Sequence, residues 1–325
     1  MFKIALLIPE AAVSAAVTST RYVFNTVNNF MVSSGKSPFF DIQLIGCQEH
    51  VPLQDGITFI KTDLRIEQPV DVDLVIIPPL YGDMQAAIEI NKKTIPWIKE
   101  QHHKGAEIAS LCVGAFLLAE TGLLDGKKCS THWAYYSEFK STYPQVEVVD
   151  GAVITEDNGI YSSGGAVSLW NLLIYLVEKY TNREMAIMIS KYFGVDIDRN
   201  NQNAFMIFKG QKNHKDKEIK KAQLFIEKNY HKKITVDELA DMVAIGRRSF
   251  ERRFKQATDN TVLEYLQRVK VEAAKRSFEN SRDNISEVMY DVGYMDTKAF
   301  RNIFRKYTGL TPVQYRYKYN RKYMA

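Results

Sequence analysis

Two stretches of the sequence place basic and amide side chains on one helix face. Residues 249–265 read SFERRFKQATDNTVLEY, and residues 299–315 read AFRNIFRKYTGLTPVQY, with Phe, Phe, Thr, Thr and Tyr at matching positions. At 100° per residue the Phe side chains share a face that must be buried, and the basic side chains lie opposite. Arginine pairs well with guanine O6 and N7, and asparagine with adenine N6 and N7, so these faces could read DNA.

A short helix pattern and a turn precede each basic stretch. TVDELADMVAIG (235–246) and NISEVMYDVGYMD (284–296) both open at capping-box spacing and contain a glycine in the turn, Gly246 or Gly293. This is typical of a helix-turn-helix, whose second helix enters the major groove. The predicted DNA-contacting residues are Arg247, Arg248, Glu251, Arg252, Lys255, Thr297, Lys298, Arg301, Asn302 and Arg305.

Within this set we expect a division of roles. Arg252 and Arg301 lie near the middle of the exposed arcs and are the predicted base readers, whereas Lys255 and Arg305 are predicted to touch phosphate. Residues 261–279, free of Gly and Pro, predict one connecting helix about 28 Å long at 1.5 Å per residue. That length would hold two reading helices roughly one DNA turn apart.

Charge is divided unevenly along the 325 residues. From residue 209 onward there are 27 Lys and Arg against 15 Asp and Glu, a net +12, which leaves 16 against 23, a net −7, for residues 1–208. A basic rear half predicts a polyanionic partner, although charge alone also fits a solvated lysine-rich surface. The length suits two or three domains.

The remaining composition predicts a cytoplasmic protein without a metal or cofactor. The three cysteines have no CxxC spacing, and no His, Cys and carboxylate set has metal-ligand spacing. The start resembles a signal peptide, but Pro9 and Glu10 interrupt its apolar run, so we expect a buried strand there. No stretch has the roughly twenty apolar residues that span a bilayer, so no membrane partner is expected.

The front half alternates apolar strand patterns with helical ones. Strands are predicted at residues 4–8, 41–46, 74–79 and 107–112, and helices at about 17–33, 84–103, 113–121 and 167–179. Such alternation predicts an α/β domain with a largely parallel, flavodoxin-like sheet between helices, ahead of an all-α rear domain. Sites form at the carboxyl ends of parallel strands, where Cys112 lies. A helix N-terminus there would favour its thiolate, unless Cys112 is only a buried structural cysteine.

The segment ASLCVGAFLLAETGLLDGKKCSTHW resembles the nucleophile-elbow segment of the PfpI-like, class I glutamine-amidotransferase-like superfamily, and the resemblance continues through SSGGAVSLWNLLIYLVEKY. It implies that Cys112 and His132 occupy the positions of an active-site pair. It also predicts a small-molecule pocket lined by Gly82, Cys112, Val113, His132, Gly164 and Gly165.

Two departures from that family argue against catalysis. The first-helix stretch AAVSAAVTSTRYVF lacks the acidic residue that catalytic members place there, and Glu10 lies too early in the chain. Catalytic members carry a Gly-Gly turn after the third strand, where PPLYGD places Pro79, which has no N–H to donate to an oxyanion. We therefore expect no catalytic residues in this chain, with Cys112 and His132 as a vestigial pair.

The rear half resembles the AraC/XylS-type DNA-binding domain, most specifically in VGYMDTKAFRNIFRKYTGLTPVQYR. A PfpI-like front fused to such a rear is similar to the GlxA family of transcriptional regulators. The expected organisation is a sensing or dimerising domain at 1–204, a lysine-rich linker at 205–216 and a DNA-binding domain at 217–325.

The resemblance implies double-stranded DNA as a partner and a cytoplasmic homodimer, with a small-molecule effector and RNA polymerase as candidate partners. The alternative function is a cysteine-dependent hydrolase or lyase with a basic appendage. Loss of Cys112 would abolish turnover in an enzyme, whereas loss of Arg301 would weaken specific DNA binding in a regulator.

Overall fold

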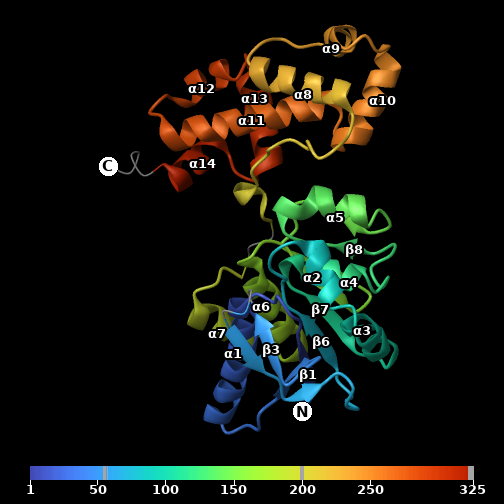
Figure 1. Ribbon diagram of the computed structural model, residues 1–325. Helices are drawn as coiled ribbons and strands as arrows, with labels where there is room; N and C mark the ends of the chain where they lie inside the picture. The colour runs from blue at the N-terminus through green and yellow to red at the C-terminus, as the bar shows by residue number, and fades with distance from the viewer. Residues whose placement is uncertain (54–55, 57, 198–200, 321–325) are drawn as a thin grey trace. The chain divides into compact units, whose positions relative to one another are not determined.

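The computed structural model describes the chain except residues 54–55, 57, 198–200 and 321–325 (Figure 1). Its contacts divide the chain into two compact units, Met1–Gln202 and Asn203–Ala325. The first unit is α/β and the second is helical, so the predicted fold class is confirmed.

A seven-stranded sheet forms the centre of the first unit, in the order β10-β11-β7-β6-β1-β2-β5. All neighbours pair in parallel except β10 and β11, which form an antiparallel edge hairpin. The inner strands read as continuous apolar runs because both sheet faces are covered. The strands are β1 (Phe2–Ile8), β2 (Phe40–Gly46), β5 (Leu64–Arg65), β6 (Leu74–Ile77), β7 (Glu107–Ser110), β10 (Ile154–Asp157) and β11 (Ile160–Ser163).

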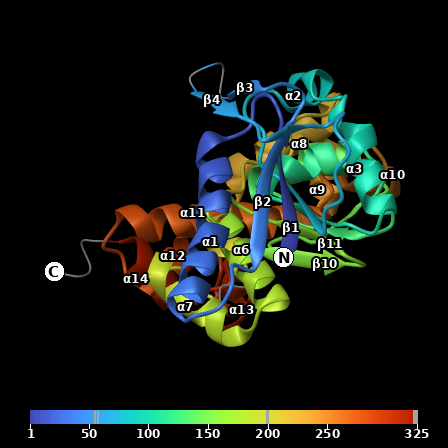
Figure 2. The same ribbon diagram turned by 90° about the horizontal axis from the view of Figure 1, so that it is seen from below.

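Helices cover both faces of this sheet (Figures 1 and 2). Alternate β1 residues serve the two layers: Leu6 packs in one core, with α1, α6 and α7, and Leu7 in the other, with α2 to α5. The helices are α1 (Ser14–Ser33), α2 (Met84–Ile90), α3 (Thr94–His103), α4 (Ala115–Ala119), α5 (Tyr136–Thr142), α6 (Ser168–Tyr180) and α7 (Arg183–Phe193).

Short elements complete the first unit. Two two-stranded pairs lie outside the main sheet, and 3-10 turns follow β7 and precede α5. These elements are β3 (His50–Leu53), β4 (Thr58–Lys61), β8 (Lys128–Cys129), β9 (Glu147–Val148), η2 (Cys112–Gly114) and η3 (Trp133–Tyr135).

The helix predicted across residues 84–103 is two helices. Asn91 ends α2, and its side-chain amide donates to the carbonyls of Glu10 and Ala87, both at 2.8 Å, while its Oδ1 accepts the N–H of Glu10 at 2.8 Å. Thr94 then starts α3, with its hydroxyl on the carbonyl of Asn91 at 2.7 Å. The amide of Asn91 thus joins the break to the end of β1, which periodicity does not reveal.

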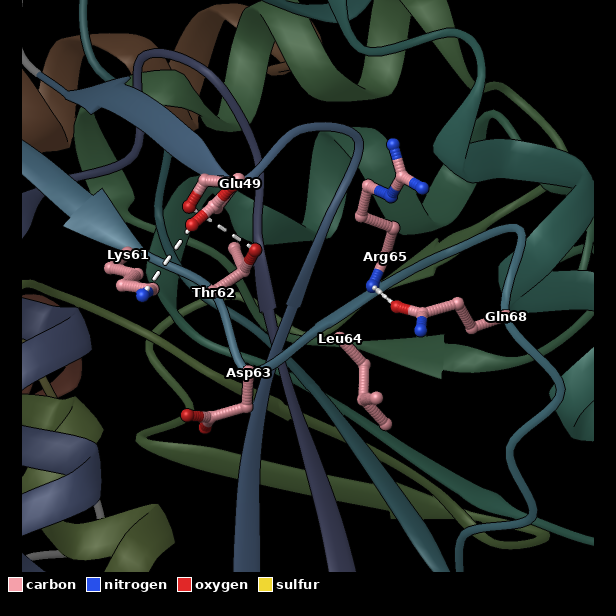
Figure 3. Close-up of a pocket in the computed structure, with 7 residues that line it drawn as sticks. All are labelled: Glu49, Lys61, Thr62, Asp63, Leu64, Arg65 and Gln68. Atoms are coloured by element: carbon pink, nitrogen blue, oxygen red, sulfur yellow. Dashed lines mark hydrogen bonds and ion pairs between the residues drawn. The ribbon is translucent and has the colours of Figure 1, made fainter.

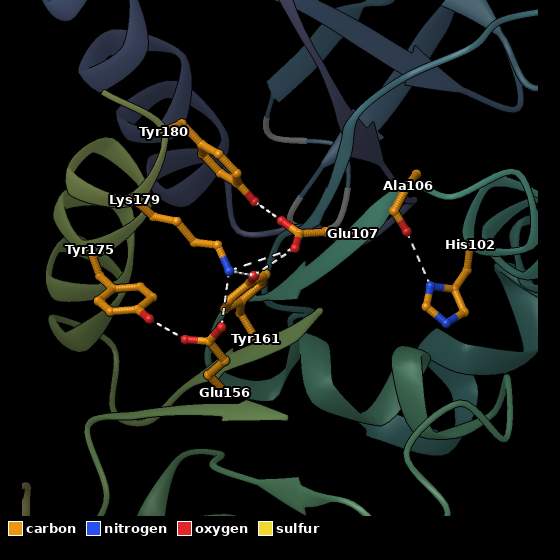
Figure 4. Close-up of polar contacts among 8 residues, drawn as sticks. All are labelled: His102, Ala106, Glu107, Glu156, Tyr161, Tyr175, Lys179 and Tyr180. Atoms are coloured by element: carbon orange, nitrogen blue, oxygen red, sulfur yellow. Dashed lines mark hydrogen bonds and ion pairs between the residues drawn. The ribbon is translucent and has the colours of Figure 1, made fainter. Parts of the chain in front are cut away.

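A polar network fastens α6 to the sheet (Figure 4). Lys179 lies 3.0 Å from a carboxylate oxygen of Glu156 and 3.6 Å from one of Glu107. The hydroxyl of Tyr161 donates to Glu107 at 3.0 Å. Because its charges are mutually paired, the network acts as a structural clasp. Its members are Glu107, Glu156, Tyr161, Tyr175, Lys179 and Tyr180.

The second unit contains two small cores that share one helix, α11. The first half of α11 packs with α8, α9 and α10, and the second half packs with α12, α13 and α14. Figure 1 shows α9 and α10 at one end of the unit and α12 and α14 at the other, with α11 between them. The elements are η4 (Asn203–Phe205), α8 (Lys217–Asn229), α9 (Val236–Met242), α10 (Arg247–Thr258), α11 (Val262–Asn280), α12 (Ile285–Asp291), α13 (Thr297–Thr308) and α14 (Pro312–Tyr319).

The segment before α8 is bound to its own unit at several points. Lys275 of α11 donates to the carbonyl of Met206 at 2.6 Å, and the N–H of Phe208 donates to Glu272 at 3.2 Å. Lys212 pairs with Glu227 of α8 at 2.6 Å. The lysine-rich stretch expected as a linker therefore runs along the helical unit as an attached strap.

Candidate nucleic-acid interface and cysteine elbow

The helices α10 and α13 are two copies of one design. Each spans twelve residues and buries its fourth, eighth and twelfth positions while the first three positions are exposed. The spacing of four residues keeps these side chains on one stripe of the helix. The buried residues are Phe250, Phe254 and Thr258 in α10, and Phe300, Phe304 and Thr308 in α13.

The aromatic packing beneath each copy is also repeated. The Phe254 and Tyr265 rings meet edge-to-face with centroids 5.4 Å apart, and so do the Phe304 and Tyr315 rings. Edge-to-face pairs are favoured by the ring quadrupole and add about 0.5–1.5 kcal/mol beyond the area that they bury. Thus α10 and α13 are each packed against the helix that follows, α11 and α14.

The exit turns match as well. The hydroxyl of Thr258 donates to the carbonyl of Phe254 at 2.7 Å, and that of Thr308 donates to the carbonyl of Phe304 at 2.8 Å. A left-handed residue follows in each copy, and then Thr261 or Thr311 begins the next helix with a complete capping box. These repeated threonines explain the pattern seen in the sequence.

The two helix-turn-helix turns differ. Gly246 does not have the left-handed conformation of a tight-turn glycine: its φ is −59°, it precedes α10, and Ala244 takes the left-handed position with φ 52°. In the second turn Gly293 is left-handed with φ 75°, and a side chain there would clash with the carbonyl of His231. The second turn also has five residues between its helices, against four in the first.

A buried lysine fastens the second turn to the shared helix. Nζ of Lys270 donates to the carbonyl of Gly293 at 2.9 Å and lies 4.9 Å from the centre of the Tyr294 ring. Burial lowers the pKa of this lysine. The turn before α13 is thus fixed directly on α11.

All ten predicted DNA-contacting residues are exposed on α10 and α13. On α10, Arg247 pairs with Asp237 at 2.9 Å, and Lys255 donates to the carbonyl of Asp259 at 2.9 Å. On α13 the predicted contact residues have no side-chain hydrogen bond or ion pair with any part of the chain that the structure describes. These are Thr297, Lys298, Arg301, Asn302 and Arg305.

Arg253 belongs to the basic stretch but takes a different role. Its guanidinium binds Asp216 through two hydrogen bonds, at 2.7 and 2.8 Å, and lies 3.2 Å from Glu218. These hydrogen bonds hold the pKa of the Asp216 carboxyl below its usual range. Arg253 therefore links α10 to the N-terminus of α8.

In the first unit, Cys112 lies on a sharp turn directly after β7. Its φ is 55°, its N–H donates to the hydroxyl of Ser163 at 3.1 Å, and its carbonyl accepts the Thr131 hydroxyl at 3.1 Å. Gly114 passes so close to β6 that a Cβ there would lie 2.7 Å from the carbonyl of Pro78. This is the backbone geometry of a nucleophile elbow.

The expected thiolate is not supported. Cys112 is 5% exposed, and burial raises the pKa of its thiol to about 12, because a buried anion loses its hydration. Burial lowers the pKa of His132, whose Nδ1 accepts the N–H of Ala134 at 3.1 Å. His132 is therefore neutral near pH 7 with its proton on Nε2, and Cys112 is a thiol.

The two departures from catalytic relatives have structural counterparts. The carbonyl of Pro79 accepts the N–H of Val13 at 2.9 Å, so this turn fastens the start of α1. Glu10 is held by Asn91 and by Gln48, whose amide donates to its carboxylate at 3.2 Å. Neither residue supplies an oxyanion donor or an acid beside the thiol.

The residues of the predicted pocket are partly brought together. Gly165 faces His132, since a Cβ on Gly165 would lie 3.8 Å from the imidazole Cδ2. Cys112, Val113 and Gly164 are buried in the same unit, whereas Gly82 is exposed on the loop before α2. Their role as a ligand pocket stays a prediction.

A separate surface pocket lies at the opposite end of the strand order, around β5 (Figure 3). Several of its polar groups bond to one another: Lys61 lies 3.4 Å from Glu49, and Gln68 accepts the N–H of Arg65 at 2.7 Å. Its lining residues are Glu49, Lys61, Thr62, Asp63, Leu64, Arg65 and Gln68. None of them was predicted as a site residue.

Sequence reasoning missed a buried glutamine beside the elbow, Gln202. Its side chain contacts residues 37 to 71 positions away, so no local pattern could have shown its role. In the described residues no cluster of three or more His, Cys, Asp or Glu is placed to hold a metal ion. No helix in the described part of the chain is long and apolar enough to cross a membrane.

The first unit matches a known family along most of its length. The model of the DJ-1/PfpI family matches residues 3–179, which is more than half of the chain. The chain belongs to the DJ-1/PfpI family. A helix-turn-helix domain model matches residues 239–318 of this DJ-1/PfpI protein, which include both reading helices. The predicted combination of the two domains is confirmed.

Curated proteins similar to this chain include two transcriptional regulators and one enzyme. The HTH-type transcriptional regulator GbdR of Pseudomonas aeruginosa is 26% identical over 259 residues, covering 79% of this chain and 69% of its own. The HTH-type transcriptional regulator GlxA of Rhizobium meliloti is 22% identical, covering 64% of each chain. An isonitrile hydratase of Pseudomonas putida is 26% identical over 130 residues, covering 40% of this chain and 55% of its own. The predicted GlxA-like regulator family is supported, and some relatives of the front domain are enzymes.

Proposed function

We propose that this DJ-1/PfpI protein regulates transcription by binding specific DNA sequences through α10 and α13. The observation that carries the proposal is the repeated helix, with one buried stripe and a basic outer face, displayed twice on α11. That helix has 19 residues and so is about 28 Å long. The two copies suit successive major grooves, which lie about 34 Å apart on one face of the duplex.

We assign base reading to Arg252 and Arg301, and phosphate contacts to Lys255 and Arg305. Arg252 and Arg301 are both exposed, and neither has a side-chain partner among the described residues. An unpaired guanidinium can approach a guanine without first giving up an ion pair. The two copies are offset by 50 residues, so Arg301 of α13 corresponds to Glu251 of α10. Arg252 therefore lies one position further along its helix, and its base contact would be displaced by one residue.

The front unit is proposed to act without catalysis. A neutral, 5% exposed thiol, no oxyanion donor at Pro79 and no acidic residue in α1 together make a poor nucleophilic site. We propose instead that this unit senses a small molecule or joins two chains into a homodimer. Contact with RNA polymerase and a cytoplasmic location are further proposals from the family resemblance.

The test begins by selecting preferred duplexes from random DNA with the purified full chain at physiological salt. Arg301→Ala should weaken binding to the selected site by about 1–3 kcal/mol, because a bidentate base contact is lost. Cys112→Ala should leave that affinity unchanged. Lys221→Ala is the matched control, since it removes one exposed positive charge of α8 outside both reading helices.

A chain that selects no sequence above random competitor would contradict the proposal. A turnover that requires Cys112, with DNA binding indifferent to Arg301, would favour the hydrolase or lyase alternative. Both results are decisive because the two functions depend on different units.

A further inference from the structure

Gln202, the last residue of the first unit, places its side chain in a fully buried polar cradle. Its Oε1 accepts the N–H of Gly165 at 2.9 Å. Its Nε2 lies 2.8 Å from the hydroxyl of Tyr136, 2.9 Å from the carbonyl of Ala152 and 3.1 Å from that of Thr131. One donor and three acceptors thus surround a single carboxamide.

The backbone is shaped around this side chain. A Cβ on Gly164 would clash with the carboxamide nitrogen, so glycine leaves the space that the amide fills. The N–H of Gln202 donates to the carbonyl of Gly151 at 2.7 Å, and Asn201 forms an antiparallel bridge with Ala152. The cradle is therefore a built site, occupied in this structure by the chain itself.

The cradle adjoins the cysteine elbow. Thr131, whose carbonyl faces Gln202, donates its hydroxyl to the carbonyl of Cys112. A Cβ on Gly165 would lie 3.8 Å from the His132 ring and 3.9 Å from the Ser168 hydroxyl. The hydroxyl of Ser168 is buried and has no hydrogen-bond partner in the described part of the chain. A polar group is thus left unsatisfied at the edge of the site, which is costly unless a ligand or water pairs with it.

Gln202 is also close in sequence to the first anchor of the helical unit. Only Asn203 separates it from Ala204, whose carbonyl accepts from the hydroxyl of Tyr319 of α14 at 3.1 Å. With the carboxamide seated, at most one residue lies between the last contact of the chain in one unit and its first side-chain anchor in the other.

We propose that this cradle is the effector site of the regulator and that it takes a small molecule bearing a primary carboxamide, which displaces Gln202. The chemistry follows from the cradle, because a primary amide offers an acceptor for the one N–H of the lining and two N–H donors for its three acceptors. A carboxylate has no N–H and would face the carbonyls of Thr131 and Ala152. Displacement releases the side chain that fixes the end of the first unit, next to the first anchor of the helical unit, and so couples ligand binding to the DNA-binding unit; this part rests on the proposed function.

The experiment uses the full chain, with acetamide as the probe and acetate as the matched probe of the same shape. Gln202→Ala empties the cradle, so it should bind acetamide at least about tenfold more tightly than the wild-type chain, because an internal competitor reduces apparent affinity by the fraction of open sites. Acetate should bind neither form. Equal acetamide affinity in the two chains, or none in Gln202→Ala, overturns the proposal.

Amide hydrogen exchange provides a second measurement. In the wild-type chain, saturating acetamide should speed exchange in the peptide that contains the Gln202 amide, while the exchange of β1 and β6 stays slow. Gln202→Glu should show the same local effect without any probe, because its carboxylate faces two carbonyls. Unchanged exchange in both cases contradicts the displacement of Gln202 by the probe. If acetamide displaces Gln202 but the chain binds no specific DNA, the amide-binding site is supported and the proposed function fails.

Discussion

The two helix-turn-helix copies are built on equivalent supports. In the first copy the hydroxyl of Tyr265 donates to Glu227 of α8 at 2.7 Å, and in the second the hydroxyl of Tyr315 donates to Glu279 of α11 at 2.5 Å. Thus α11 supports the second copy as α8 supports the first, and it also follows the first reading helix as α14 follows the second. The buried half of the design is repeated, while the turns and the outer faces are not.

The outer faces differ in how far their charges are already neutralised. Arg247 on α10 is paired with Asp237, whereas Lys298, Arg301 and Arg305 on α13 have no side-chain hydrogen bond or ion pair in the described residues. A paired arginine must give up part of its interaction before it can bind DNA. The comparison teaches that equal packing does not imply equal binding, and we expect α13 to contribute more affinity per arginine.

The strongest way to break the structural equivalence is to remove one matched ring from each core. Phe254→Ala and Phe304→Ala should each destabilise the helical unit by about 3–5 kcal/mol, because each leaves a cavity under a reading helix. Urea unfolding followed by circular dichroism measures the loss. If the losses of stability in the two variants differ by more than about 2 kcal/mol, the full width of the expected range, the cores are not equivalent.

The difference in pairing predicts unequal effects on DNA binding. Arg301→Ala should cost about 1–3 kcal/mol of specific affinity, whereas Arg247→Ala should cost less than about 1 kcal/mol, because an exposed ion pair already occupies Arg247. Fluorescence anisotropy with the selected duplex at fixed salt gives both values. An equal or larger loss at Arg247 would reject the inferred bias towards α13.

The capping boxes allow a finer comparison. Thr261→Ala and Thr311→Ala should each cost about 1 kcal/mol, because each hydroxyl accepts an N–H in the first turn of the next helix. Thermal unfolding of the two variants measures the costs. Replacement by serine, which keeps the hydroxyl, is the matched control and should restore most of the loss. No loss in either alanine variant would mean that water replaces these caps without cost.

Acid provides the smallest and most selective test. Hydrogen bonds from Arg253 lower the pKa of Asp216, and backbone hydrogen bonding by Thr261 lowers that of Glu264, both in the first copy. Because the folded-state pKa values are depressed, this stability is present above the unfolded values near 4 and is lost as pH falls through the folded ones. The first copy should therefore open before the second in acid.

Amide exchange resolved by peptide, recorded between pH 5 and pH 3, follows the opening of each copy. Asp216→Asn should remove much of the pH dependence of the first copy while it lowers stability at neutral pH. If α12 and α13 lose protection before α9 and α10, the carboxylates do not decide the order.

Features set by local periodicity could be predicted well. The connecting helix was expected at 261–279 and is α11, Val262–Asn280, because its apolar spacing is unbroken. The buried phenylalanines of both reading helices follow from the same geometry. The strand expected to reach residue 79 ends at Ile77, since Pro78 and Pro79 have no N–H for the ladder.

Features set by distant contacts could not be predicted. The raised pKa of Cys112 depends on burial by the whole unit, which outweighs the helix terminus that the local sequence suggests. The cradle of Gln202 joins four segments of the chain, and nothing in the neighbouring residues marks it. Ala244 takes a left-handed conformation that glycine would be expected to supply, so the position of a glycine in the first turn misled the assignment.

The matched burial of α10 and α13 has a consequence for engineering. Because the side chains that pack and those that face outward occupy the same positions in both helices, the outer residues of one can be transplanted onto the other without repacking either core. A chain that carries the outer residues of α13 on both helices would recognise a direct repeat of one half-site in place of two different half-sites. The residues that set specificity can thus be exchanged between the two helices while the residues that set stability stay the same.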